Sequence, residues 1–195
     1  MPQKPKILAF AGSARSGSLN KQLIGVAARA ATAAGGEVTL IDLRDYLLPV
    51  YDGDLEVAEG IPANAKKLKA LFIEHQGLLI ASPENNASVS ALLKNTIDWI
   101  SRQDGDVSGL VPYQNKVAGL LTASPSVRGG VRGIPHLRAI LDTLGVLVLA
   151  GHVGIAHADK AFGPEGSLLD ARQQSAVAAL VERLVDTCRR LEGKT

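Results

Sequence analysis

The sequence predicts an α/β protein with a doubly wound, five-stranded parallel sheet in the order 2-1-3-4-5 and helices on both faces. Short apolar runs alternate along the chain with longer amphipathic segments, which is the pattern of right-handed βαβ units. Three of the runs are apolar without a period-two break, as in strands that helices cover on both faces. These runs are Leu78–Ala81, Val117–Leu121 and Val146–Ala150.

The chain opens with a strand, a helix and a second strand. The apolar run Ile7–Ala11 predicts the first strand. A helix is expected to begin after Ser18, because serine is a good N-cap, and to end at Gly35-Gly36, because glycine commonly terminates helices. The segment Glu37–Leu43 predicts the second strand.

The middle of the chain repeats this alternation. Apolar residues on one side predict a helix from about Pro62 to His75, and the next apolar run predicts a strand over Gly77–Ser82. The third helix carries apolar residues at i, i+4 and i+7, namely Leu93, Ile97 and Ile100.

The last part of the chain predicts two further strands, Val117–Ala123 and Val146–Ala150, around a helix. Pro135 stands near the start of that helix and Gly145 at its end, which are the usual places for these residues. A final helix carries one apolar stripe, made of Val177, Leu180, Val181, Leu184, Val185, Cys188 and Leu191.

Composition excludes several classes of protein. The formal net charge is only +2, and no cluster of Lys and Arg interleaves with aromatic residues, so we expect no nucleic-acid partner. No stretch approaches the ~20 apolar residues that a membrane-spanning helix needs. Cys188 is the one cysteine, which excludes an internal disulfide framework and is consistent with a reducing compartment. We therefore expect a single domain over residues 1–195 in a cytoplasmic protein.

The loop after the first predicted strand reads Gly12-Ser13-Ala14-Arg15-Ser16-Gly17-Ser18-Leu19-Asn20 and opens into a helix. Unpaired backbone N–H groups and the helix dipole favour an anion there, and a guanidinium can add a bidentate contact to a phosphate. A polar turn with an ordinary serine cap is the alternative, although a cap needs one hydroxyl and this loop offers several. The loop matches neither the Walker pattern nor Gly-x-Gly-x-x-Gly. The single phosphate of a mononucleotide is the better interpretation.

The motif Gly-Ser-x-Arg-x-x-Ser-x-Asn at residues 12–20 resembles the phosphate loop of the NADPH-dependent FMN reductase family, which includes bacterial quinone, chromate and azo reductases. The resemblance runs from about Ile7 to Leu191 and implies a flavodoxin-like three-layer sandwich. It also implies that the FMN phosphate is held by Ser13, Arg15, Ser18 and Asn20, and that Leu19 belongs to the same cofactor-binding loop.

The loop after the third predicted strand is similar to a second motif of the same family. It reads Pro83-Glu84-Asn85-Asn86-Ala87-Ser88 and is followed by Leu93-Lys94-Asn95 and Asp98-Trp99. From the residues alone it is a short turn leading into a helix capped by Ser88 or Ser90. The resemblance implies that the flavin ring is lined by Pro83, Glu84, Asn85, Asn86 and Ser88.

Two residues depart from this second motif. Asn85 stands where the family has a tyrosine, and Ser90 where a proline is common. A tyrosine ring against a flavin contributes apolar burial and aromatic contact of ~1–3 kcal/mol, which an amide does not reproduce. We therefore expect either weaker FMN binding or a wider space for a bulky second substrate.

A third motif follows the fourth predicted strand. Relatives have Ala-Ser-x-Gly-x-x-Gly-Gly at this place, beside the flavin. Ser124, Gly129 and Gly130 match this pattern, whereas Ser126 departs from its first glycine. Adjacent glycines allow a positive φ or a close approach of the backbone to a ligand.

The sequence offers no catalytic acid or base, since it has no Ser-His-Asp order and no paired-carboxylate motif. His152 and His157 are five residues apart without a thiol or carboxylate cluster, so we expect no metal site. Flavin chemistry fits this absence, because the cofactor itself accepts and delivers hydride. We expect an FMN-dependent enzyme that reduces a quinone or free flavin with NADPH or NADH in a ping-pong order.

Two alternatives stay open. A flavodoxin-type electron carrier would bind FMN without reacting with NAD(P)H, although such carriers usually present an acidic face and this chain is slightly basic. A degenerate family member with weak flavin binding would act as a sensor or structural protein. The resemblance also implies a homodimer or homotetramer, with Trp99 and the helices after the third and fourth strands as interface candidates and Leu48–Asp54 as an ordered loop near the partner.

Overall fold

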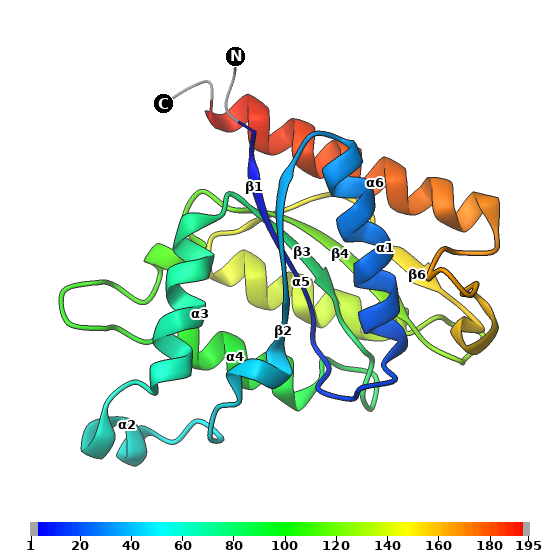
Figure 1. The fold of residues 1–195 in the computed structure, drawn as a ribbon. Coiled ribbons are helices and arrows are strands. Elements are labelled where there is room, and N and C mark those ends of the chain that lie inside the picture. The colour runs from blue at the N-terminus through cyan, green and yellow to red at the C-terminus, as the bar shows by residue number, and fades with distance from the viewer. Residues whose placement is uncertain (1–3, 193–195) are drawn as a thin grey trace.

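The computed structural model describes residues 4–192, so the three positions at each end of the expected domain lie outside the described residues. Its centre is a parallel sheet (Figure 1). The strands are β1 (Lys6–Ala11), β2 (Glu37–Asp42), β3 (Gly77–Ala81), β4 (Val117–Ala123), β5 (Leu147–Val148) and β6 (Val153–Ile155). They stand in the order β2-β1-β3-β4-β5, and β6 also pairs with β4. The predicted order of the sheet is confirmed.

Two short strands share the fifth position, where the sequence predicts one strand over Val146–Ala150. β5 pairs with the start of β4 and β6 with its end. Residue 118 of β4 pairs with residue 148, and residue 121 pairs with residue 153. Between these two pairs, β4 therefore spans three positions and the neighbouring segment spans five. The extra residues form a bulge that contains Gly151 at a φ of 79°. Leu147 is 52% exposed at this edge of the sheet, so the expectation that the whole run is buried on both faces is wrong.

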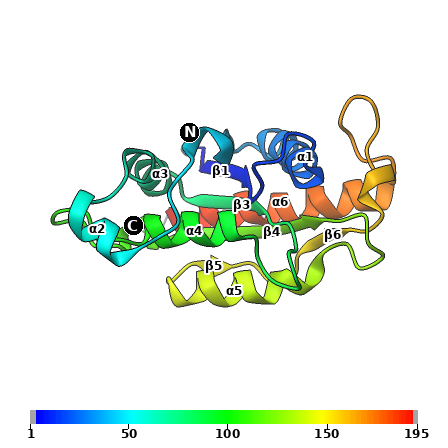
Figure 2. The same ribbon diagram turned by 90° about the horizontal axis from the view of Figure 1, so that it is seen from below.

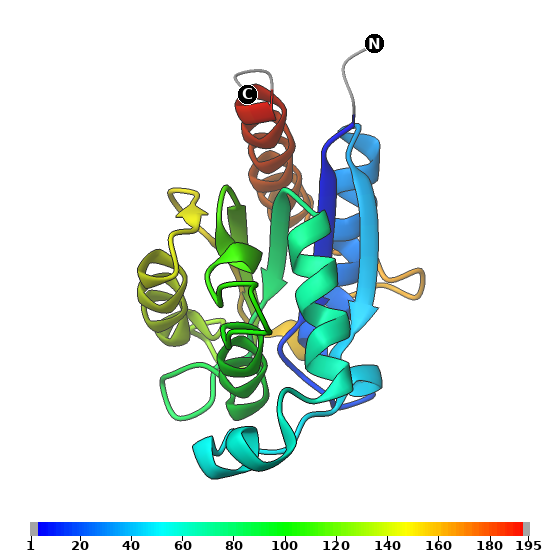
Figure 3. The same cartoon turned by 90° about the vertical axis from the view of Figure 1, so that its left-hand side faces the viewer.

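Helices cover both faces of the sheet, as predicted. They are α1 (Leu19–Ala33), α2 (Gly53–Glu59), α3 (Ala63–Glu74), α4 (Ala91–Ile100), α5 (Ile134–Thr143) and α6 (Ala171–Glu192). Side chains of α1 and α6 form one core with the sheet, and those of α3, α4 and α5 form the other. Figure 2 shows α1 and α3 on opposite sides of the sheet, and Figure 3 shows α3 and α4 in front of it.

The side chains of β1 show how each inner strand serves both cores. Ile7, Ala9 and Ala11 contact the core under α1 and α6. Leu8 and Phe10 contact the core under α3, α4 and α5. Because alternate residues face opposite cores, the strand has no polar face. On α6 the predicted stripe is buried, with the exception of the exposed last member of that stripe.

The predicted ordered loop at Leu48–Asp54 runs into α2, which the sequence did not predict. Asp52 caps this helix by accepting a hydrogen bond from the backbone N–H of Asp54 at 2.8 Å. None of its residues is buried, so it has no apolar periodicity to recognise. Trp99 is fully buried and donates from Nε1 to the carbonyl oxygen of Pro49 at 2.8 Å. Trp99 therefore packs within the chain and attaches this loop to α4. The expectation that Trp99 is an interface residue is wrong.

The topology brings three loops to one edge of the sheet. The parallel strands β1, β3 and β4 all end at the lower edge of Figure 1. β2 lies on one side of β1 and β3 on the other, so the winding reverses between β1 and β3. Ligands of doubly wound sheets bind at this point. Within residues 4–192 no helix is long and apolar enough to cross a membrane.

Candidate functional site

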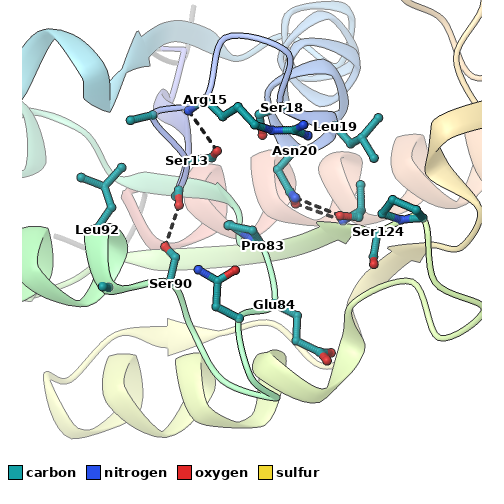
Figure 4. Close-up of a pocket in the computed structure, with 16 residues that line it drawn as sticks. Ser13, Arg15, Ser18, Leu19, Asn20, Pro83, Glu84, Ser90, Leu92 and Ser124 are labelled. Atoms are coloured by element: carbon teal, nitrogen blue, oxygen red, sulfur yellow. Dashed lines mark hydrogen bonds between the residues drawn. The ribbon is translucent and has the colours of Figure 1, made fainter.

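A pocket of about 480 Å³ opens at this edge (Figure 4). This volume lies within the range of roughly 300–1,000 Å³ that is typical of small-molecule sites. The loops after β1, β3 and β4 form it. Its lining consists of Gly12, Ser13, Ala14, Arg15, Ser18, Leu19, Asn20, Pro83, Glu84, Asn85, Ser90, Ala91, Leu92, Ala123, Ser124 and Pro125.

The start of α1 is open to a ligand. Ser18 is the N-cap residue, as predicted, but its buried side chain makes no capping hydrogen bond. The first turn of α1 contains no acidic residue. The positive end of the helix dipole therefore reaches the pocket without a local carboxylate to neutralise it, which is the electrostatic condition for binding an anion.

Arg15 supplies the cationic side chain of the same loop. Its backbone N–H donates to Ser13 Oγ at 3.4 Å, which shapes the loop. The guanidinium is exposed at the rim of the pocket, on the side of Ser13 and Ser18 in Figure 4. No carboxylate in the described part of the chain lies within ion-pair distance of it. Its charge is thus available to an anionic ligand.

Asn20 ties the start of α1 to the end of β4. Its Nδ2 donates to the carbonyl oxygen of Ala123 at 2.9 Å, and its Oδ1 accepts from the N–H of Ala123 at 3.0 Å. Both hydrogen bonds are buried, so the amide group holds two loops of the pocket together. The phosphate contact that the sequence predicts for Asn20 stays a prediction.

The loop after β3 contains a two-residue hairpin turn. The N–H of Asn85 donates to the carbonyl of Ser88 at 3.0 Å, and the N–H of Ser88 donates back at 2.9 Å. Both central residues have a positive φ, 50° at Asn86 and 64° at Ala87. This is the geometry of a type I′ turn. Asparagine tolerates it, whereas the left-handed conformation costs an alanine ~1–2 kcal/mol.

Ser90 joins the loops after β1 and β3. Its Oγ accepts a hydrogen bond from the N–H of Leu93 at 3.2 Å, which makes it the cap of α4, and donates to the carbonyl of Gly12 at 2.6 Å. The sequence left the cap open between Ser88 and Ser90. The link to the first loop was not predicted, and a proline at this position would make neither bond.

Glu84 forms another wall of the pocket and pairs with Arg132, which precedes α5. The backbone N–H of Arg132 donates to Oε2 and its Nε donates to Oε1, both at 2.8 Å. Burial acts to raise the pKa of Glu84, but the hydrogen bonds from the side chain and backbone of Arg132 outweigh it and hold the pKa below its usual value. Glu84 is therefore an ionised carboxylate at neutral pH, not a proton donor.

Gly129 and Gly130 shape the loop after β4. Their φ angles are 65° and 80°, so the predicted positive φ is confirmed. A side chain at Gly129 would meet the backbone N of Ala156 at 2.9 Å, and one at Gly130 would meet Thr122 Oγ1 at 2.5 Å. The close approach is therefore to the chain itself. Ser124, at the start of the same loop, lines the pocket.

The pocket collects most of the predicted site residues. Nine of the thirteen line it, whereas four lie outside the lining, namely Asn86, Ser88, Gly129 and Gly130. The lining residues that the sequence did not predict are Gly12, Ala14, Ser90, Ala91, Leu92, Ala123 and Pro125. All of them lie within four positions of a predicted residue, in the three loops, at the end of β4 or in the first turn of α4. Position along the chain was therefore the available signal, not side-chain chemistry.

The lining contains no aromatic residue. In the described residues, no group of three or more His, Cys, Asp or Glu side chains is placed to hold a metal ion. The pocket thus offers anion-binding groups at one side, and on the others proline, aliphatic, amide, hydroxyl and main-chain groups together with the Glu84 carboxylate that Arg132 pairs. This arrangement suits a planar molecule bearing one phosphate.

Comparisons with known proteins show the family of the chain. The family model described as NADPH-dependent FMN reductase matches residues 5–160. The chain is 33% identical over 193 residues to an NAD(P)H-dependent FMN reductase of Pseudomonas aeruginosa, with 96% of this chain and 97% of the relative covered. It is 34% identical over 149 residues to a quinone reductase of Escherichia coli K12, with 76% of each covered.

A solved structure extends the likeness to three dimensions. FerB, a flavoenzyme NAD(P)H:(acceptor) oxidoreductase from Paracoccus denitrificans, superimposes with a TM-score of 0.78 at 25% identity, covering 95% of this chain and 98% of that chain. The flavodoxin-like fold expected from the sequence is confirmed. The matched segment includes all three loops of the pocket, and the chain belongs to the NADPH-dependent FMN reductase family.

Proposed function

We propose that the protein is an FMN-dependent NAD(P)H oxidoreductase that reduces quinones, free flavins or similar small acceptors. The N-terminus of α1 is the observation that carries this proposal. There the Ser18 hydroxyl, the helix dipole and the Arg15 charge lie at one side of a 480 Å³ pocket without a cap hydrogen bond or, among the described residues, a carboxylate to satisfy them. The names of the two relatives, an NAD(P)H-dependent FMN reductase and a quinone reductase, support the same chemistry.

The residues present fit FMN. Ser13, Arg15 and Ser18, with the first backbone amides of α1 at Leu19 and Asn20, form a donor set for a phosphate. The ring would be framed by Pro83, Glu84 and Asn85 on the lining, by the turn at Asn86 and Ser88, and by the loop with Ser124, Gly129 and Gly130.

FMN, when bound, would accept a hydride from NADPH or NADH and reduce the acceptor. If both substrates use the same site in turn, the kinetic order is ping-pong. The residues of the chain bind and orient the ring. Because Glu84 is ionised and paired with Arg132, it does not act as a proton donor. We assign no catalytic side chain.

Asn85 supports a quinone or flavin as the second substrate. It lies on the lining of the pocket where an aromatic ring is expected in the family, and its shorter side chain leaves more room beside the flavin. A relative from Burkholderia, 30% identical over 144 residues, is named a 2-hydroxy-1,4-benzoquinone reductase, which fits a cyclic acceptor of this size.

We also propose that the protein forms a homodimer or homotetramer through α4 and α5, the helices after β3 and β4. A groove of about 350 Å³ lies between them and includes the apolar side chains of Ile97, Ile140 and Leu144. A single cytoplasmic domain over residues 1–195 is part of the same proposal. Light scattering after size exclusion would test the assembly, and a monomer at micromolar concentration would contradict it.

Steady-state kinetics test the proposed reaction. The FMN-loaded protein should oxidise NADPH or NADH in the presence of a benzoquinone, and double-reciprocal plots at several quinone concentrations should be parallel. Intersecting lines would contradict the ping-pong order. Retained FMN without turnover on either nucleotide would favour the electron carrier, whereas failure to retain FMN would favour the sensor or structural alternative.

A further inference from the structure

We infer that Arg132 is a positioning residue for the flavin ring, because it anchors the turn at residues 85–88 through Glu84. This inference rests on the FMN-binding function proposed above. It concerns a residue of the loop after β4 that does not itself line the pocket.

The ion pair between Arg132 and Glu84 engages both oxygens of the carboxylate. Arg132 donates from its backbone N–H to Oε2 and from Nε to Oε1, each at 2.8 Å, and its Nη2 lies 2.5 Å from Oε1. The Glu84 side chain is 9% exposed and the Arg132 side chain 54%. A largely buried carboxylate with both oxygens occupied by one arginine is held in a single orientation. Glu84 therefore serves as an anchor for the loop after β3.

Two neighbouring contacts attach the same turn to the same segment. His136 Nδ1 lies 2.8 Å from Ser88 Oγ. A side chain at Gly133 would stand 2.8 Å from the carbonyl oxygen of Ser88, so the two backbones are in close contact. The segment 132–136 thus contacts the loop after β3 at two places, at Glu84 near the start of that loop and at Ser88 near its end.

The turn needs an external anchor because its own conformation is unfavourable. Its two central residues, Asn86 and Ala87, both have a positive φ, and alanine gains nothing from that conformation. The hydrogen bonds within the turn join Asn85 and Ser88 to each other and to nothing outside. Contacts with Arg132, Gly133 and His136 therefore fix where the turn stands relative to the pocket.

The test compares Arg132→Gln with Arg132→Lys and with a matched control, Arg102→Gln. Arg102 forms a similar pair with Glu56, at 2.9 Å between Nε and Oε2, but neither residue lines the pocket. FMN affinity is measured by fluorescence quenching, and the visible circular dichroism of the bound flavin reports the surroundings of the ring. Hydrogen exchange of residues 85–88 is measured without FMN.

Arg132→Gln should weaken FMN binding about tenfold, which corresponds to ~1.4 kcal/mol. It should also alter the visible dichroism and accelerate exchange in the turn about tenfold, whereas Arg102→Gln should change none of these. Arg132→Lys should recover part of the lost FMN affinity, because an ammonium keeps the positive charge but lacks the planar set of donors of a guanidinium.

FMN affinity within twofold of wild type in Arg132→Gln, with unchanged dichroism and exchange, would overturn the inference while leaving the proposed function intact. An equal loss in Arg102→Gln would also overturn it, since general destabilisation would then explain the effect. A wild-type protein that binds no FMN would instead refute the proposed function, and the exchange measurement would still decide whether Arg132 anchors the turn.

Discussion

Replacing Asn20 with alanine should destabilise the protein even when no FMN is present. The Asn20 amide satisfies both backbone groups of Ala123, at 2.9 and 3.0 Å, in a buried place. Truncation leaves the N–H and the carbonyl without these partners, and each unsatisfied buried group costs ~1–3 kcal/mol. Because water can enter next to the pocket, we expect a total loss near the lower half of that sum, about 2–4 kcal/mol in the free energy of unfolding.

Urea unfolding of the FMN-free protein measures this loss directly. Gln22→Ala is the matched control, because Gln22 lies on the same helix with an exposed side chain and should change the free energy of unfolding by less than about 0.5 kcal/mol. An Asn20→Ala protein as stable as wild type, but with weaker FMN binding, would contradict the structural role of Asn20. Asn20 would then be a phosphate ligand without a structural role.

Three further predictions follow from the same loops. Arg15→Gln should weaken FMN binding about tenfold, because it removes a charge-assisted contact. Fluorescence titrations with and without added salt measure this, and the result would contradict the prediction if salt lowered the FMN affinity of wild type no more than that of the variant. Ala87→Gly should raise the free energy of unfolding by about 1 kcal/mol in urea, since glycine adopts a positive φ without strain, and a decrease would show that the turn has another conformation. Glu84→Gln should be less stable than wild type at pH 7, and the difference should shrink in acid. The folded pKa of Glu84 is lowered, so its contribution is complete above the ordinary value of 4.5 and is lost as the pH falls through the lowered value. A difference that does not vary with pH would contradict the ion pair.

The sheet and the position of the site could be predicted because they depend on local patterns. The unbroken apolar runs at β3 and β4 follow from burial on both faces, and both strands are fully buried. The parallel order then places the loops after β1, β3 and β4 at one edge. The first loop has more hydroxyl groups than the single one that a helix cap uses, which indicated an anion site. In the structure the Ser18 side chain makes no cap hydrogen bond.

What could not be predicted depends on contacts between distant segments. The hydrogen bonds between Asn20 and Ala123 join positions 103 apart in the sequence, so no local pattern revealed them. The pairing of Glu84 with Arg132 spans 48 positions and leaves no local pattern. The division of the fifth strand at Gly151 and the short helix α2 were missed for another reason, because a bulge and a helix without a buried residue carry no apolar periodicity.

The flavin spectrum under anaerobic conditions shows whether the protein binds FMN and reduces it with a nicotinamide nucleotide. The purified protein is mixed with FMN, freed of excess cofactor, and recorded before and after addition of NADPH and, separately, NADH. If the protein is an FMN-dependent NAD(P)H oxidoreductase, FMN stays bound at micromolar protein and its visible absorption bleaches with at least one of the two nucleotides. Loss of the cofactor on removal of the excess, or bound flavin that neither nucleotide bleaches, would contradict it.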